Sequence, residues 1–408
     1  MPIPTPFHSR TSAVCESYEW RSWAGYLAAG LYEPSHEREY FAIRNSAAMI
    51  DVSPLFKYEI SGPDAARVVD RIITRDVSKC QVGQVMYSPW CDEEGKVIDD
   101  GTIARLDENH FRITAADPNL NWFQDVGYGF DAQVTDVSTD LAALSLQGPS
   151  SRAVLKEVVS GIDFEQLNYF CLAHGQVEDA RPHGFPLTVT RTGYTGDLGY
   201  ELWVRPQHAE SLWDRLVEAG SRYGVLPAGM VALDMARIEA GMLLIEVDYI
   251  SSHYARIEAQ KSSPFELGLG WTVALDKFGS TGRGPGFIGQ KALRAEKARG
   301  SKWAFIGLTI DWVGLEKLYD RVDLPPQVTG RAARDPVPLF KNGKQIGQIT
   351  SRTFSPLLKK YIGLGTVLRE NAAAGTQVEI EITVEYSRER GPATITKTPF
   401  YDPPHKKE

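Results

Sequence analysis

The stretch that decides the fold is Arg191-Thr-Gly-Tyr-Thr-Gly-Asp-Leu-Gly-Tyr-Glu201. It places three glycines and two tyrosines between two strand-like runs, Leu187–Thr190 and Glu201–Val204. Glycine tolerates the backbone angles of a tight turn and adds no bulk, so the pattern predicts a hairpin that a flat ligand can approach. The Glu201 carboxylate can accept two parallel hydrogen bonds from a ring N–H and its amino group, as in pterins and guanine. The alternative is a plain hairpin with core tyrosines and a solvated glutamate.

A second informative stretch lies upstream, Tyr87-Ser-Pro-Trp-Cys-Asp-Glu-Glu-Gly-Lys-Val-Ile-Asp-Asp100. Its adjacent aspartates face opposite sides of a strand, so at most one of them shares a pocket with Tyr87. By itself the pair is more typical of two turn-associated carboxylates in water. Together and in this order, the two stretches resemble the aminomethyltransferase (glycine-cleavage T-protein) family of folate-binding proteins. That family also includes tetrahydrofolate-dependent demethylases and the folate domains of sarcosine and dimethylglycine dehydrogenases.

The resemblance implies a set of residues around a tetrahydrofolate co-substrate. It places Asp99, the first aspartate of the pair, at the catalytic position, where a carboxylate stabilises cationic character or relays a proton. It places four residues around the pterin: Tyr87, Tyr194, Glu201 and Arg237. From its helix pattern alone, Arg237 also fits a salt-bridged residue. Further matching landmarks are Asp51–Ser53, Gln147–Pro149, Gly268–Trp271, Phe287–Gly289, Thr350-Ser351 and Ser355-Pro356.

The chain departs from typical glycine-cleavage members at positions that the resemblance places near the one-carbon donor. Pro54-Leu55 replace a histidine, Ala116 replaces an asparagine, and Arg352 replaces a glycine. We therefore expect a small methylated donor, of the sulfonium, betaine or methoxy type. Arg352 would pair with its carboxylate, and aromatic faces would contact its cationic methyl group. The aromatic candidates are Trp20, Trp23 and Trp90, although tryptophans in such clusters also serve as core residues.

The expected function is a tetrahydrofolate-dependent one-carbon transferase, a demethylase that moves a methyl group to N5 of the folate. One alternative is an aminomethyltransferase that acts on a lipoyl carrier protein. A second alternative, of another class, is a non-catalytic folate-binding protein, in which the Asp99 position would be free to vary. We expect no attached oxidoreductase domain, which argues against a flavin dehydrogenase.

The composition of this 408-residue chain argues against several classes of binding partner and site. A net charge of −8 argues against nucleic acid or an anionic membrane as the main partner. No apolar stretch approaches the roughly 20 residues of a membrane helix, and the N-terminus lacks a signal-peptide pattern, so we expect a soluble cytoplasmic protein. The four cysteines are scattered and the eight histidines isolated, which predicts no metal site and no disulfide framework.

The predicted fold is α+β, in the three-domain, cloverleaf-like architecture of aminomethyltransferases. Residues 56–141 alternate strands and helices and predict a ferredoxin-like domain. Residues 1–55 and 142–270 form the predicted folate-binding domain. Short strands joined by turns predict a small β-barrel in residues 271–408. We expect Asp276–Gly286 to be a glycine-rich loop and the polar end, Asp402–Glu408, to fray.

Overall fold

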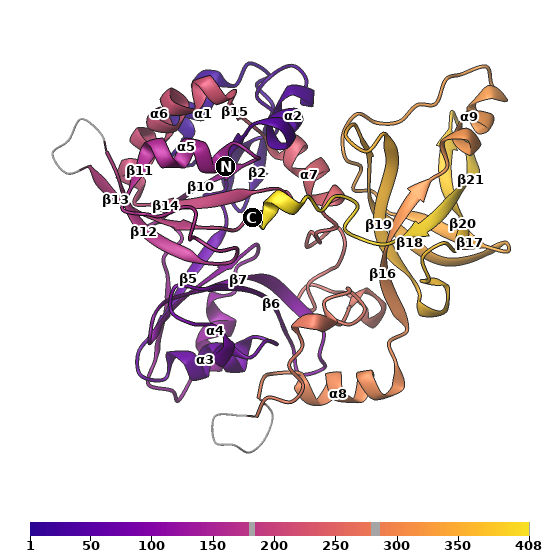
Figure 1. Ribbon diagram of the computed structural model, residues 1–408. Helices are drawn as coiled ribbons and strands as arrows, with labels where there is room; N and C mark the ends of the chain where they lie inside the picture. The colour runs from indigo at the N-terminus through magenta and orange to yellow at the C-terminus, as the bar shows by residue number, and fades with distance from the viewer. Residues whose placement is uncertain (179–183, 279–285, 408) are drawn as a thin grey trace.

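The computed structural model describes residues 1–178, 184–278 and 286–407, so most of the glycine-rich segment Asp276–Gly286 lies outside the described residues. The strands form a seven-stranded sheet, a five-stranded sheet and a closed barrel, with a three-stranded sheet near the N-terminus (Figure 1). The predicted α+β class and the C-terminal barrel are confirmed. The three predicted domain boundaries stay a prediction, although each large sheet draws its strands from one predicted domain.

The seven-stranded sheet carries the glycine-rich hairpin. Its inward side chains, such as Tyr200 and Leu202, pack beneath helices α5 (Ser151–Val158) and α6 (Ala209–Gly220). Because strand side chains alternate, Glu201 and Trp203 lie on the opposite face. The strands are, in sheet order, β11 (Val159–Ser160), β12 (Leu172–Val177), β13 (Phe185–Thr190), β14 (Gly199–Val204), β10 (Ala142–Gln147), β4 (Ala48–Asp51) and β15 (Leu226–Pro227).

The five-stranded sheet has one strand more than the four of a simple ferredoxin-like unit. Phe111 and Ile113 face its own core beneath α3 (Ala65–Ile72) and α4 (Leu120–Gly127). Arg112 therefore points the other way, and its guanidinium lies 4.6 Å from the centre of the Trp203 ring of the seven-stranded sheet. The two sheets thus face each other. The strand order is β6 (Val85–Cys91), β7 (Val97–Asp107), β8 (His110–Ala115), β5 (Phe56–Ser61) and β9 (Gln133–Asp136).

The barrel closes in the order β16, β19, β18, β17, β20 and β21, and it stands apart from the two sheets in Figure 1, coloured orange to yellow. Alternate apolar residues such as Leu308, Ile349 and Ile380 fill its interior. Its strands are β16 (Trp303–Ile310), β17 (Val337–Lys341), β18 (Lys344–Ser355), β19 (Lys360–Leu368), β20 (Gln377–Val384) and β21 (Ser387–Thr396). Helices α8 (Gln290–Arg299) and α9 (Trp312–Asp320) flank β16 in sequence.

The N-terminal segment packs against the seven-stranded sheet through α2 (Glu37–Asn45), which meets α7 (Met230–Glu239) in a shared apolar cluster. The rest of this segment comprises β1 (Ile3–Pro4), α1 (His8–Val14), β2 (Trp20–Trp23) and β3 (Tyr26–Ala29). Single 3₁₀ turns lie at Val77–Lys79, Pro206–His208, Ser221–Tyr223, Glu258–Gln260, Gly270–Thr272, Arg369–Asn371 and Pro404–Lys406.

A buried ionic network joins α2, α7 and the glycine-rich turn to the barrel. Arg44 of α2 donates to Glu239 Oε2 at 2.7 and 2.9 Å and to the Thr195 carbonyl at 2.9 Å. Ser355 of the barrel donates to the other Glu239 oxygen. Arg44 also lies 3.4 Å from Asp197, and both of these side chains are fully enclosed. The network therefore anchors the glycine-rich turn to α2, to α7 and to the barrel at once.

The C-terminal segment returns from the barrel to this network, and the chain end lies beside the seven-stranded sheet (Figure 1). Tyr401 Oη donates to Asp197 Oδ2 at 3.1 Å, and His405 Nε2 lies 2.7 Å from Asp197 Oδ1. Arg191 donates to the Lys406 carbonyl at 3.2 Å. The expectation of a frayed end is therefore wrong at His405 and Lys406, because the His405 side chain and the Lys406 carbonyl pair with residues of the glycine-rich turn.

Candidate active site

A carboxylate held by two tyrosines lies where β6 meets β7. Tyr87 Oη donates to Asp100 Oδ2 at 2.7 Å, and Tyr249 Oη donates to Asp100 Oδ1. Burial raises the pKa of Asp100 above its ordinary value, and the two tyrosine hydroxyls oppose that rise. Asp100 therefore takes up a proton more readily than a carboxylate in water does.

The predicted catalytic residue, Asp99, faces the other side of β7 and is 0% exposed. It accepts hydrogen bonds from Asn119 Nδ2 at 2.9 Å, from the Asp117 amide at 3.1 Å and from the Asp100 amide at 2.8 Å. Burial and the neighbouring Asp100 carboxylate raise the pKa of Asp99 well above its usual range. Strand alternation predicted that only one of the two aspartates contacts Tyr87, and in the structure this residue is Asp100. The catalytic assignment to Asp99 stays a prediction.

Glu201 offers an acceptor edge on the facing sheet. Thr192 Oγ1 donates to Glu201 Oε2 at 2.6 Å, and Thr190 Oγ1 lies 3.4 Å from the same oxygen. Glu201 Oε1 accepts no hydrogen bond from the part of the chain that the structure describes. The side chain is only partly buried, so this oxygen is available to the ring N–H or amino group of a ligand.

The sequence suggested that the glycines of the turn leave room for a ligand, but the structure shows that they leave room for protein side chains. A Cβ atom at Gly193 or at Gly199 would lie 2.1 Å from Gln147 Oε1. Gly196 has a φ of +76°, and a Cβ there would lie 2.5 Å from the Ala240 side chain. The protein's own side chains therefore require these glycines, and no ligand contact is needed to explain them.

Two predicted pterin contacts are occupied by protein groups. Tyr194 Oη donates to the Leu243 carbonyl. Arg237 is fully buried and donates to Asp234 at 2.8 Å, to Asp248 at 2.5 Å and to Ser351 at 2.8 Å. The salt-bridged role that the helix pattern left open for Arg237 is the one that the structure shows, and it fastens α7 to the barrel.

The predicted donor contacts lie elsewhere. Arg352 of β18 interacts with Tyr361 of β19. The residue that contacts Arg237 is its neighbour, Ser351. Trp90 is 0% exposed and donates to Asn119 Oδ1 at 3.1 Å, which makes it a core residue. Trp20 packs on His8, and Trp23 packs against the α2–α7 cluster. Among the described residues, no hydrogen bond, ion pair or ring contact joins these four side chains to Tyr87, Asp100 or Glu201.

Two residues of this site, Tyr249 and Trp271, are not among those predicted from the sequence. Tyr249 completes the grip on Asp100, and nothing in the loop that carries it distinguishes it from other tyrosines. Trp271 stacks on Tyr87, with ring centres 6.2 Å apart and planes 26° apart, and the Arg75 guanidinium lies over its ring at 5.5 Å. Trp271 is 67% exposed, so a large aromatic face stands open beside the tyrosine that holds Asp100. Its place in the landmark Gly268–Trp271 was the available signal.

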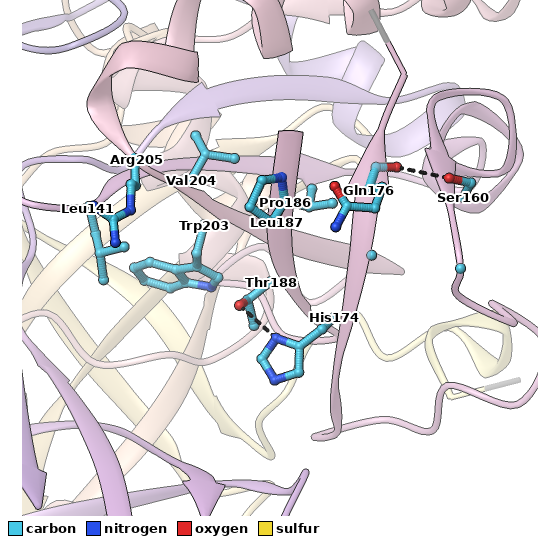
Figure 2. A pocket seen from close by; sticks show the side chains of 12 residues that line it. Leu141, Ser160, His174, Gln176, Pro186, Leu187, Thr188, Trp203, Val204 and Arg205 are labelled. Atoms are coloured by element: carbon cyan, nitrogen blue, oxygen red, sulfur yellow. Dashed lines mark hydrogen bonds between the residues drawn. The ribbon is translucent and has the colours of Figure 1, made fainter. Parts of the chain in front are cut away.

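A separate shallow groove runs over the open face of β12, β13 and β14 (Figure 2). In this groove His174 Nδ1 lies 3.0 Å from Thr188 Oγ1, and the ring of Trp203 forms one wall. Trp203 also stacks on Arg112, but neither Asp100 nor Glu201 lines the groove. The groove therefore lies outside the site formed by Asp100 and Glu201.

Within the described ranges, no helix is both long and apolar enough to cross a membrane. No cluster of three or more histidine, cysteine, aspartate or glutamate side chains in the same ranges is arranged to hold a metal ion.

Comparison with known proteins assigns the chain to a family. A family model described as the GCVT N-terminal domain matches residues 6–277, and one described as the glycine cleavage T-protein C-terminal barrel domain matches residues 322–402. The chain belongs to the aminomethyltransferase family. This is a family of enzymes, so the predicted enzyme class is confirmed.

Curated relatives of this family member carry two different activities in their names. An aminomethyltransferase of Desulfitobacterium hafniense is 34% identical over 348 residues, which are 84% of this chain and 85% of the relative. A trimethylamine-oxide aldolase of Ruegeria pomeroyi is also 34% identical, over 407 residues that cover 98% of this chain but 47% of that protein. The glycine cleavage system aminomethyltransferase T from Bartonella henselae has the same fold, with a TM-score of 0.80, 23% identity and coverage of 98% and 99%.

Proposed function

We propose that this protein transfers a one-carbon unit from a small methylated donor to tetrahydrofolate. The observation that carries the proposal is the Asp100 carboxylate held by Tyr87 and Tyr249. Asp100 and Thr102 leave the same face of β7, and Thr102 pairs with Thr114, two residues from Arg112 on β8. Asp100 is therefore on the same face of its sheet as Arg112. Arg112 stacks on Trp203 of the other sheet, and Trp203 is on the same face as Glu201. We infer that the Asp100 carboxylate and the Glu201 acceptor edge line the space between these two sheets.

The residues present fit a reduced folate. Glu201 Oε1, which no described residue occupies, can accept from the ring N–H or the amino group of the pterin, and Tyr87 and Trp271 offer flat faces. The folate supplies a nucleophilic ring nitrogen, N5, that accepts the one-carbon unit. Tyr87 and Tyr249 hold Asp100 in one orientation by donating to both of its oxygens. Such fixed positioning of two reactants and a proton acceptor lowers the entropic cost of a displacement.

Asp100 has a defined task in this reaction. As the new N–CH₃ bond forms, the C–S or C–N bond of a sulfonium or quaternary ammonium donor breaks, and the donor leaves as a neutral sulfide or amine. The ring nitrogen must then lose its proton. Asp100 takes up that proton, and its raised pKa makes the transfer more favourable than to an ordinary carboxylate.

The relatives support two donor classes. The trimethylamine-oxide aldolase, which aligns with nearly the whole chain, favours a donor with a methylated nitrogen. The relatives named aminomethyltransferase favour the second candidate, transfer of an aminomethyl group from a lipoyl carrier protein. That candidate needs a protein partner, whereas the first needs only a small molecule.

Product analysis distinguishes the two candidates. The protein is incubated with tetrahydrofolate and, separately, with sulfonium, betaine, methoxy-aromatic and amine-oxide donors or with an aminomethyl-loaded lipoyl carrier. We expect a one-carbon folate from one of the small donors without any carrier. Methylene-tetrahydrofolate and ammonia formed only with the carrier would establish the second candidate instead. The absence of folate product and of folate binding under all conditions would refute both.

Tyr249→Phe tests the proton acceptor through pH. The Tyr249 hydroxyl lowers the pKa of Asp100, so its removal raises that pKa further. Because Asp100 must be ionised to accept a proton, activity is lost as the pH falls through this pKa. We expect the acid limb of the kcat/KM profile to move to higher pH in the variant. Ionisation of the folate affects both profiles equally, so an unmoved limb would exclude Asp100 as the group that titrates.

A further inference from the structure

Arg112 is a buried arginine whose guanidinium has no hydrogen-bond partner among the described residues. Its side chain lies between the two facing sheets, and the residue is 4% exposed. Its Nη2 atom is enclosed and has no partner, and no hydrogen bond or ion pair within the described residues involves its guanidinium. The guanidinium lies over the Trp203 ring, 4.6 Å from its centre. Since a buried charged donor without an acceptor is costly, the position calls for a partner that the protein itself does not supply.

The contacts around Arg112 indicate that the missing partner binds beside Glu201. Trp203 and Glu201 are two residues apart on β14, so their side chains leave the same face. Trp203 Nε1 donates to Thr190 Oγ1 at 3.2 Å, Thr190 Oγ1 lies 2.8 Å from Thr192 Oγ1, and Thr192 donates to Glu201. The chain of contacts from Arg112 to Glu201 is thus continuous through Trp203.

Charge agrees with this geometry. Burial lowers the pKa of Arg112 to about 10, and the Glu201 and Glu59 carboxylates oppose that decrease. Arg112 therefore remains a cation at neutral pH and lies within electrostatic reach of Glu201. No hydrogen bond joins the guanidinium to Glu201 within the described chain, so each keeps hydrogen-bonding capacity for a third group between them.

We propose that Arg112 is a specificity-determining residue that donates a hydrogen bond to the 4-oxo oxygen of the pterin, while Glu201 accepts from the adjacent ring N–H and amino group. The proposal rests on the proposed folate-dependent function. The edge of a 4-oxo pterin presents two donors followed by one acceptor. A carboxylate beside an unpartnered guanidinium is the complement of that order. Arg112 would then discriminate against 4-amino pteridines, in which a second amino group replaces the acceptor.

The test compares two ligands that differ at this position, tetrahydrofolate and tetrahydroaminopterin, by anaerobic titration calorimetry. In the wild-type protein we expect tighter binding of the 4-oxo ligand. Arg112→Met should weaken 4-oxo binding on the order of ten- to a hundredfold, because a charge-assisted hydrogen bond is lost. Its affinity for the 4-amino ligand should change less than threefold or improve.

Two further variants keep the test decisive. Arg112→Gln retains a neutral N–H donor and should keep most of the preference for the 4-oxo ligand, even if Arg112→Met folds poorly. Thr188→Val is the matched control. Thr188 is on the same face of β13 as Thr190 but lines the groove of Figure 2, so its substitution should alter neither affinity. Equal losses for both ligands, or no loss, in a folded Arg112→Met protein would overturn the role of Arg112. Failure of the wild-type protein to bind either ligand would refute the proposed function itself.

Discussion

Asp100→Asn lowers kcat about a hundredfold or more, while the Kd for tetrahydrofolate changes less than threefold. The magnitude is that of losing a positioned general base. Asparagine fills the same volume and still accepts a hydrogen bond through its carbonyl oxygen, but it cannot take up the proton released in the reaction. Single-turnover kinetics with the donor identified by product analysis, together with titration of folate binding, measure the two quantities separately.

Asp99→Asn is the matched comparison, because it changes the adjacent residue by the same single atom. Asp99 accepts from Asn119 and Asp117, which lie just before α4, and from the amide of its neighbour Asp100 on β7. We therefore expect a lower thermal midpoint but a kcat within a few fold of the wild type. The reverse pattern, with Asp99→Asn inactive though folded and Asp100→Asn active, would restore Asp99 as the catalytic residue.

Arg44→Met should destabilise the protein by about 3–5 kcal/mol, the usual loss when one member of a buried ion pair is removed. Arg44 is enclosed and supplies hydrogen bonds to Glu239 and to the Thr195 carbonyl. Methionine matches its length but leaves Glu239 and Asp197 as buried carboxylates without this cation. Denaturant unfolding, followed by tryptophan fluorescence and by circular dichroism, measures the loss.

Arg10→Met is the surface counterpart. Arg10 pairs with Asp214 at 2.8 Å, but both side chains are exposed, and such pairs contribute little. Its unfolding midpoint should match that of the wild type. An Arg44→Met protein as stable as Arg10→Met would mean that the network does not hold the glycine-rich turn to α2 and α7.

The hairpin of Leu187–Thr190 and Glu201–Val204 was predictable because β-branched and aromatic alternation around clustered glycines is a local signal. The same holds for the short strands and turns that predicted the C-terminal barrel. These features depend on neighbours a few residues apart, and the sequence displays such neighbours directly.

The tertiary structure alone decided which aspartate faces Tyr87, because Asp99 and Asp100 differ only in which face of β7 each one occupies. It alone showed that Trp90 is a core residue, that Arg237 forms ion pairs with Asp234 and Asp248, and that Arg352 lies beside Tyr361. It also brought Tyr249 to Asp100 and Arg112 to Trp203. Each of these contacts joins residues that are remote in sequence or depends on strand register. Local patterns carry no information about such pairing, because packing between distant elements determines it.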